Sequence, residues 1–425
     1  MEPKKTKRLK YILKHKLLGN GLWLYTLQLF NTLVPLLTLP YVTRVLGPEN
    51  YGVFSAALNL VTYFQVTVEY GFNLSGTRKV ALASDQMEIS NLYSRILSSK
   101  LFLALISFAL MLGLSLFLEI EDIQFKVMLI LYIIVIGTSL QQTWLFQGLE
   151  DMKLITISNV ISRTLSVILI FIFVNNSDHI VLYSFLYSLT YLLIGVINII
   201  IVKSKYSMKL NRVSINSMFE ELKDGWYLFT TSAMGKVFSG FGVTILVFSS
   251  SEFEVGVYSA IDKIPQILKM LYAPLGQVIY PYISRLYTES FSQGYAKIIS
   301  IIKYIIIVFG SISILLLINS RYIVNVLYGS EYVNYSYLLI PLIIWTILSI
   351  INNLLGVQVL VASGHLKEYS TAFRIGVVAI VCLNILFGIK YGSFGISIAA
   401  ALAELVLTIS ILLQIIKIKK EEFNG

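Results

Sequence analysis

Runs of about 20 apolar residues, separated by charged or turn residues, recur along the whole chain. The first, from about Leu17 to Tyr41, directly follows the basic stretch MEPKKTKRLKYILKHK. A run of ~20 apolar residues is long enough to cross the hydrocarbon core of a bilayer as a helix. Charged residues make up only 13% of the 425 residues, about half the roughly 25% that is usual in soluble domains. We therefore predict an all-α polytopic membrane protein in which the first apolar run is retained as a span.

Counting apolar windows of about 20 residues predicts twelve transmembrane helices. We expect them near 18–43, 52–76, 95–118, 124–148, 154–174, 180–202, 224–249, 255–284, 298–319, 336–361, 370–390 and 393–416.

Lysine and arginine set the orientation of such spans, because cytoplasmic loops hold an excess of both. With a cytoplasmic N-terminus, 25 of the 33 fall in inner segments and four in outer loops, the latter being Arg44, Lys126, Arg321 and Lys390. The inner set includes Lys100, which we place close to a loop. This alternation also argues against nucleic-acid binding as the reason for the net charge of +10, since it follows the spans. We expect both termini in the cytoplasm and the loops at 119–126 and 175–179 outside.

A short motif returns half a chain later. GVFSA begins at Gly52 and GVYSA at Gly256, 204 positions on, and each opens the second helix of its half. A weaker echo relates FQGLEDMK at Phe146 to ASGHLKEY at Ala362, where Gly148 and Gly364 would allow backbone angles that a side chain strains. Six spans on each side of a basic loop indicate two parallel repeats.

The expected domains follow from this repeat. They are a basic cytoplasmic N-terminus (1–16), an N-terminal six-helix lobe (17–203), a cytoplasmic linker (204–223), a C-terminal six-helix lobe (224–417) and a cytoplasmic tail (418–425).

The run PLLTLPYVTRVLGPENYGVFSA, then EYGFNLSGTRKVA, and FQGLEDMK further on resemble the polysaccharide flippases, which carry O-antigen and capsule repeat units. These belong to the multidrug, oligosaccharidyl-lipid and polysaccharide exporter superfamily. The likeness is specific over the first ~80 residues and at Gln147 to Lys153. Where the family commonly has Asp before Tyr-Gly-Phe, this chain has Glu69, so the carboxylate is kept.

Polar residues inside spans are candidates for function, because a charge there costs about 2.5–3.5 kcal/mol on insertion scales and usually faces a water-filled interior. The expected substrate-binding residues are Arg163, Lys236, Lys263, Lys269, Asn31, Asn59 and Gln266. The expected ion-coupling residues are Glu69, Asp262 and Glu404, and the expected gating or turn residues are Gly52, Gly256, Arg44 and Gly148. Structural alternatives are that Lys263 pairs with Asp262 and that Glu69 bridges to Arg78.

Cations outnumber acids in the spans, which favours an anionic substrate. The resemblance implies that this anion is the pyrophosphate of a polyprenyl-linked oligosaccharide, moved outward by alternating access across a bacterial cytoplasmic (inner) membrane. It also implies as partners the bilayer, a proton or sodium ion, and a polysaccharide polymerase with its chain-length machinery. The alternatives are an exporter of small molecules or drugs, a membrane polymerase or ligase of lipid-linked sugars, and a passive scaffold.

Enzymatic motifs are missing from the sequence. Gly235-Lys236 is not part of a P-loop, and there is no His-Glu-x-x-His, no acidic metal cluster and no CxxC pair, since Cys382 is the single cysteine. We therefore expect neither catalysis nor a cofactor.

Overall fold

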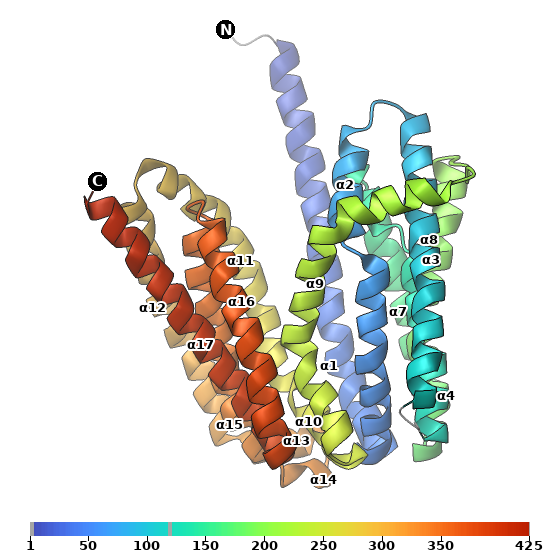
Figure 1. Ribbon diagram of the computed structural model, residues 1–425, viewed down its shortest axis with the longest axis vertical. Helices are drawn as coiled ribbons and strands as arrows, with labels where there is room; N and C mark the ends of the chain where they lie inside the picture. The colour runs from blue at the N-terminus through green and yellow to red at the C-terminus, as the bar shows by residue number, and fades with distance from the viewer. Residues whose placement is uncertain (1–3, 118–120, 425) are drawn as a thin grey trace. The chain divides into compact units, whose positions relative to one another are not determined.

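The computed structural model describes residues 4–117 and 121–424, and the side chains of residues 19–117 and 121–420. Leu118 to Ile120, in the loop expected outside, and the side chains of the basic N-terminus lie outside the described residues. Within the described ranges the chain is helical and contains no strand (Figure 1). The prediction of an all-α protein is therefore confirmed.

The first half of the chain contains α1 (Lys4–Glu69), α2 (Phe72–Leu82), α3 (Gln86–Phe117), α4 (Asp122–Leu131), α5 (Ile133–Leu140), α6 (Thr143–Gly148), α7 (Met152–Phe173), η1 (Ser177–His179) and α8 (Ile180–Lys205). The second half contains α9 (Ile215–Ser249), α10 (Glu252–Ile261), α11 (Lys263–Glu289), α12 (Phe291–Ile318), α13 (Ser320–Tyr328), α14 (Ser330–Val333), η2 (Ser336–Leu338), α15 (Leu339–Asn352), η3 (Asn353–Val361), α16 (Leu366–Leu383), η4 (Asn384–Gly388) and α17 (Ile389–Asn424).

Nine helical stretches of the described chain are long and apolar enough to cross a membrane. Two of them are interrupted by glycines in non-helical conformations, Gly47 in α1 and Gly392 in α17. At the second break, the backbone N–H of Ser393 donates to Glu254 Oε1 (2.7 Å). The predicted span 255–284 is not among the nine: it falls in α10 and α11, and α11 carries two lysines and two internal prolines.

Large apolar side chains lie on the outside of these helices. Leu116 and Phe117 in α3 are 82% and 84% exposed, and Ile318 at the end of α12 is 75% exposed. In water so much exposed apolar surface would be unfavourable, whereas lipid tails solvate it. The chain is therefore a multi-pass membrane protein.

Two compact units make up the chain. Unit 1 consists of residues 1–46 and 57–236, and unit 2 consists of residues 47–56 and 237–425. Residues 47–56 of helix α1 thus belong to unit 2, and α9 begins in unit 1 and ends in unit 2. The segment expected to be a linker is partly helical, because α9 begins at Ile215.

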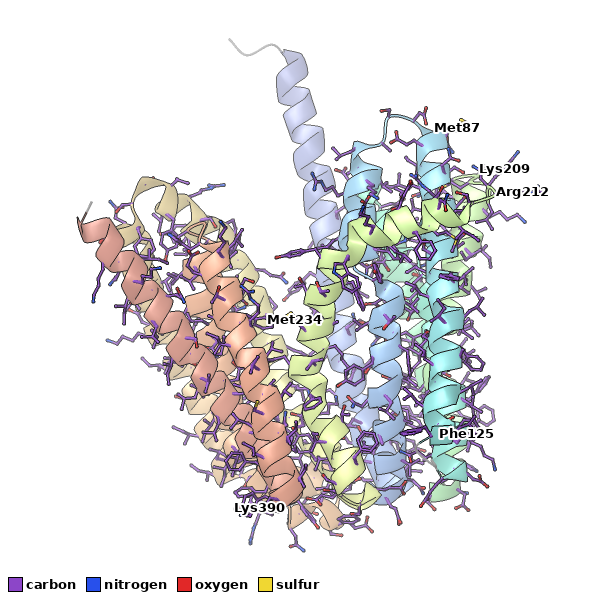
Figure 2. All side chains as sticks on the ribbon, in the orientation of Figure 1. Met87, Phe125, Lys209, Arg212, Met234 and Lys390 are labelled. Atoms are coloured by element: carbon purple, nitrogen blue, oxygen red, sulfur yellow. The ribbon has the colours of Figure 1, made fainter. Side chains whose placement is uncertain are left out.

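In unit 1, α8 packs against α4, α5 and α7 (Figure 1). Figure 2 shows Met87, Lys209 and Arg212 at one end of this unit and Phe125 at the other. The loops before α3 and before α9 therefore share one end, while α4 begins at the opposite end. This is the alternation that the charge pattern predicts for neighbouring loops.

In unit 2, α17 packs against α15 and α16, and α11 packs against α12 and α15 (Figure 1). Between α15 and α16 lies a π-helical turn, η3, and a second one, η4, follows α16. Such turns widen a helix by one residue and often lie at functional sites.

Candidate functional site

Lys236 lies in α9 beside the second part of α1, within unit 1. Its ammonium donates a hydrogen bond to Asn59 Oδ1 (3.3 Å) and lies 5.1 Å from the centre of the Tyr63 ring. Asn59 and Tyr63 are four residues apart and so share one face of α1. The structure thus brings together two predicted site residues, Lys236 and Asn59, and adds Tyr63, whose ring face attracts a cation.

Arg163 in α7 lies level with Asn31 in α1. Thr156 Oγ1 donates to Trp23 O, and Tyr41 Oη donates to Val174 O, both at 2.8 Å. Both bonds join residues 133 positions apart, so α1 and α7 run parallel in a fixed register that puts residue 163 beside residues 30 and 31. The Nε of Arg163 and the Oδ1 of Asn31 are each buried without a hydrogen-bond partner.

Both atoms are complementary in chemistry, because one is a donor and the other an acceptor. Buried polar atoms are normally hydrogen-bonded, so each of the two marks an unsatisfied polar position on its own helix. Arg163 also interacts electrostatically with Tyr187 of α8.

Lys100 is a buried cation that the sequence reading placed near a cytoplasmic loop. It lies inside α3 with 2% of its surface exposed. Its ammonium donates to the carbonyl oxygens of Thr138 (3.1 Å) and Gln141 (3.2 Å), at the end of α5. The assignment to the loop-facing set was wrong because α3 begins at Gln86, nine residues earlier than the predicted span.

Glu69 is the acidic partner of this lysine. It interacts electrostatically with Lys100 and accepts a hydrogen bond from Gln65 Nε2 (3.4 Å). Arg78, the alternative partner suggested by spacing, is exposed in α2. Glu69 therefore feels the charge of a cation 31 positions away in α3, without a direct ion pair to it among the described residues.

Asp262 in unit 2 is the residue between α10 and α11. It accepts a hydrogen bond from Gln266 Nε2 and interacts electrostatically with Lys263 and Lys269. Lys263 is exposed and donates to Gln266 Oε1 at 3.5 Å. All four predicted site residues in this stretch thus lie together at the start of α11.

Glu404 in α17 is the buried acid of unit 2, with 3% of its surface exposed. Its Oε2 accepts a hydrogen bond from Asn352 Nδ2 (2.5 Å), and it interacts electrostatically with Lys269. The Lys269 ammonium lies 4.1 Å from the centre of the Trp345 ring. Asn352 and Trp345 were not predicted, although Asn352 is a polar residue inside the apolar run of the predicted span 336–361.

Gly52 and Gly256 lie against each other where the segment 47–56 crosses α10 in unit 2. A Cβ built on Gly52 would lie 2.6 Å from the Glu252 carbonyl carbon and 3.0 Å from Gly256 N. One on Gly256 would lie 2.8 Å from Gly52 N and 2.9 Å from the Pro48 carbonyl carbon. The crossing is reciprocal, because Pro48 and Glu252 are separated by the same 204 positions as the two glycines. Both glycines lie in helices and serve a close backbone approach.

Gly148 has a different role from the one its sequence position suggests. It is the last residue of α6 and has no positive φ; a Cβ there would lie 2.5 Å from Val80 Cβ and 3.0 Å from Thr77 O. Gly364, its counterpart in the echo, does have a positive φ of 93°. Close packing against α2 thus explains the first glycine, and backbone conformation explains the second.

Arg44, the other predicted gating residue, is exposed on α1 one turn before the break at Gly47.

Asp151 of the FQGLEDMK stretch joins the start of α7 to the end of α8. It pairs with Lys205 and accepts a hydrogen bond from Tyr206 Oη (2.9 Å). Burial, together with this acidic acceptor, raises the pKa of Tyr206 above its ordinary value. Asp151 therefore connects the start of α7 with the end of α8 in unit 1.

A second ionic cluster joins α2, α3 and α9 in unit 1. Lys79 Nζ pairs with Glu221 (2.6 Å) and Asp224 (2.9 Å), and Arg95 Nε lies 3.4 Å from Glu221. Beside it is an open groove of about 460 Å³, whose lining includes Asp85, Asn91, Arg95 and Arg212. Sequence reading used these cations only to count loop charges.

Known proteins are similar to this chain in sequence over most of its length. The model of a family described as "Polysaccharide biosynthesis protein" matches residues 17–287. A "Putative O-antigen transporter" of Shigella dysenteriae is 31% identical over 92% of this chain and 98% of its own. Another "Putative O-antigen transporter", from Escherichia coli (strain K12), is 30% identical over 84% of this chain and 86% of its own.

Solved structures share the fold. "Lipid II flippase MurJ, inward closed conformation" has a TM-score of 0.73 at 16% identity and covers 93% of this chain and 87% of that chain. A multidrug resistance MATE family transporter of the MOP superfamily, in an inward-facing conformation, has a TM-score of 0.72 at 14% identity and covers 91% of this chain and 96% of that chain. At such low identity these likenesses concern the fold alone.

Proposed function

Because the chain belongs to the polysaccharide biosynthesis protein family, as the resemblance of its motifs predicted, we propose that it is a flippase for lipid-linked sugar units. It translocates polyprenyl-pyrophosphate-linked oligosaccharides from the cytoplasmic to the outer leaflet of a bacterial inner membrane, for O-antigen or capsule assembly. The observation that carries this proposal is the 31% identity to a protein named as an O-antigen transporter over nearly the full length of both chains.

The cations inside the helices suit this substrate. Lys236 lies beside an amide and a tyrosine ring, and Arg163 lies level with Asn31. Guanidinium and ammonium groups form strong charge-assisted bonds to phosphate oxygens, and amides bind hydroxyl groups. We assign Arg163, Lys236, Lys263 and Lys269 to the pyrophosphate, and Asn31, Asn59 and Gln266 to polar groups of the head group.

Transport by alternating access needs two halves that move and a source of energy. We infer twelve spans. The nine helical stretches become eleven when α1 is divided at Gly47 and the chain of α16, η4 and α17 is divided at Gly392, and α10 with α11 adds the twelfth. Both termini are cytoplasmic, as the distribution of lysine and arginine indicates. The reciprocal crossing of Gly52 and Gly256 supports a parallel repeat, since a two-fold relation makes each partner meet the other in the same way.

A proton or a sodium ion would supply the energy through Glu69, Asp262 and Glu404, each of which interacts with a lysine. The relatives are named as transporters, and we assign no catalytic step to the chain. The likeness to a MATE transporter concerns the fold alone, so it favours no drug as cargo.

The direct test is translocation by the purified protein in proteoliposomes that contain a polyprenyl-pyrophosphate oligosaccharide. We expect an added glycosidase to cleave the sugars of both leaflets in vesicles with the protein, and only the fraction already in the outer leaflet in empty vesicles. In cells, a disruptant should accumulate single lipid-linked units on the cytoplasmic side. Accumulation on the external side would instead indicate a polymerase or ligase, and unchanged accessibility in the vesicles would contradict the proposal.

A further inference from the structure

The end of α5 is a place where backbone carbonyls need a partner. The last carbonyls of any helix lack an intrahelical N–H and carry the negative end of the helix dipole. Here the chain leaves the helix at Gln141, which is extended, and α6 begins at Thr143. The Thr138 and Gln141 carbonyls accept hydrogen bonds from the Lys100 ammonium at 3.1 and 3.2 Å.

Further buried oxygens belong to residues next to this contact in the sequence, although none of them accepts a hydrogen bond from the ammonium. Three side-chain oxygens here are buried without a hydrogen-bond partner. They belong to Ser99, which precedes Lys100 in the chain, to Thr138, whose carbonyl accepts from Lys100, and to Gln142, which follows Gln141. Glu69 adds a carboxylate that interacts with the ammonium. Carbonyl, hydroxyl and carboxylate oxygens are the ligands that hard cations prefer.

We propose that the end of α5, together with Glu69, forms a monovalent-cation site that the chain fills with its own Lys100 ammonium. The ammonium is about the size of a potassium ion, so the site takes ammonium-type or alkali-metal cations. A free cation has no place there while Lys100 is present. The chain thus carries its own counter-cation for Glu69 in unit 1. Of the two proposed coupling ions, only a proton can then act through Glu69, and a sodium ion would have to act through Asp262 or Glu404.

Removing the side chain but keeping the oxygens tests this site. We would purify the full-length Lys100→Ala protein and the wild type in detergent and measure thermal unfolding in potassium, sodium, ethylammonium and choline chloride at equal ionic strength. The readout is the difference between variant and wild type in each salt, which cancels salt effects elsewhere in the protein. Because this readout needs no transport assay, the cation site is tested independently of the proposed function.

We expect the unfolding temperature of the variant to fall most in choline chloride, whose cation is too large for the site. Potassium or ethylammonium should restore several degrees of the loss. Lys126→Ala, at an exposed position in α4, should show no difference in any salt. Adding Glu69→Gln to Lys100→Ala should abolish the dependence on the cation. An equal loss in all four salts would overturn the proposal.

A second variant covers the case in which Lys100→Ala does not fold. If the missing ammonium leaves the Glu69 charge uncompensated, Lys100→Met alone should be depleted from the membrane, and Lys100→Met/Glu69→Gln should return to at least half the wild-type amount. A double variant no more abundant than the single one would show that Lys100 does not act as the counter-cation of Glu69.

Discussion

Unit 1 and unit 2 each bury one charge that neutral groups hold, and these two charges differ in sign. In unit 1 this charge is the Lys100 ammonium, held by helix-end carbonyls and facing the charge of the less buried Glu69; the other buried charge of unit 1, Glu221, is paired directly with Lys79 and Arg95. In unit 2 the charge held by neutral groups is the Glu404 carboxylate, held by the Asn352 amide and balanced by the less buried Lys269. In each unit a neutral group supplies the hydrogen bonds and a second charged residue supplies the opposite charge.

The difference follows from which backbone or side-chain groups each unit offers. A broken helix such as α5 presents carbonyls, which can only accept hydrogen bonds, so a donor such as lysine fits there. At the end of α15 the chain continues into the π-helical turn η3 without leaving the helix, and there the side-chain amide of Asn352 can donate to an acid. If the two arrangements are equivalent, removing either buried charge should have similar consequences, and the following variants examine this.

The largest effect is expected from Glu404→Ala. Breaking a buried pair by removing one partner costs about 3–5 kcal/mol, because the other charge stays uncompensated. Glu404→Gln keeps an acceptor for Asn352 and should cost less than about 1.5 kcal/mol. Thermal unfolding of the purified protein measures both, with the exposed Glu289→Ala as control. If the Glu404→Ala protein is as stable as the wild type, Glu404 is not needed for stability in the way that we expect of Lys100.

A somewhat smaller effect should follow from a large side chain at the glycine crossing. Gly52→Leu and Gly256→Leu would each force the facing backbone apart, at a cost of about 1–3 kcal/mol. Since the contact is reciprocal, both variants should reduce glycan display to a similar extent while still inserting. Gly310→Leu, in α12 where a Cβ meets nothing within 4 Å, is the matched control. A loss in only one of the two variants would contradict the reciprocal crossing.

The cations of the two units should differ in their importance for transport. Lys236→Ala and Arg163→Ala in unit 1 remove a charge-assisted bond worth about 1.5–3 kcal/mol, so display should fall about tenfold or more. The reciprocal Lys236→Arg and Arg163→Lys should stay partly active, and Glu at either position should be inactive. Lys263→Ala and Lys269→Ala in unit 2 should have smaller effects, since Asp262 offsets their charge.

Complementation of surface glycan display, divided by the amount of protein in the membrane, measures this series. Lys126→Ala, at an exposed position near the start of α4, is the control for loss of a lysine. Stable Lys236→Ala and Arg163→Ala proteins that display glycan normally would refute the assignment of these cations to the pyrophosphate.

The smallest effect concerns the aromatic rings beside two of these lysines. Lys269 lies 4.1 Å from the Trp345 ring and Lys236 5.1 Å from the Tyr63 ring. Such contacts are worth about 0.5–2 kcal/mol, most for tryptophan. We expect Trp345→Leu to destabilise the protein more than Tyr63→Leu, and Trp345→Phe to lie between Trp345→Leu and the wild type. A double-mutant cycle with Lys269→Met measures the coupling; a value near zero would show that the ring only packs.

The sequence by itself determined the class of protein, its helical content and its family. Apolar runs and charge alternation are properties of neighbouring residues, so they can be read without knowing which helices meet. The same is true of the motifs around Gly52 and Gly256, whose echo indicated equivalent positions in two repeats; their contact is known only from the structure. Asn59 and Lys236 were found as polar residues in apolar runs, and the structure brings them to 3.3 Å.

Only the tertiary structure decided what surrounds each buried group. Lys100 lay near the start of a predicted span and was counted with the loop charges, because nothing in its neighbours reveals that α5 ends beside it. Nothing in the apolar run of α15 shows that Asn352 and Trp345 contact Glu404 and Lys269. The reason for a glycine at position 148 is the close packing of Val80 against it, which the sequence does not show. A buried charge is stabilised by groups distant in the chain, and their positions depend on helix packing, which no local pattern encodes.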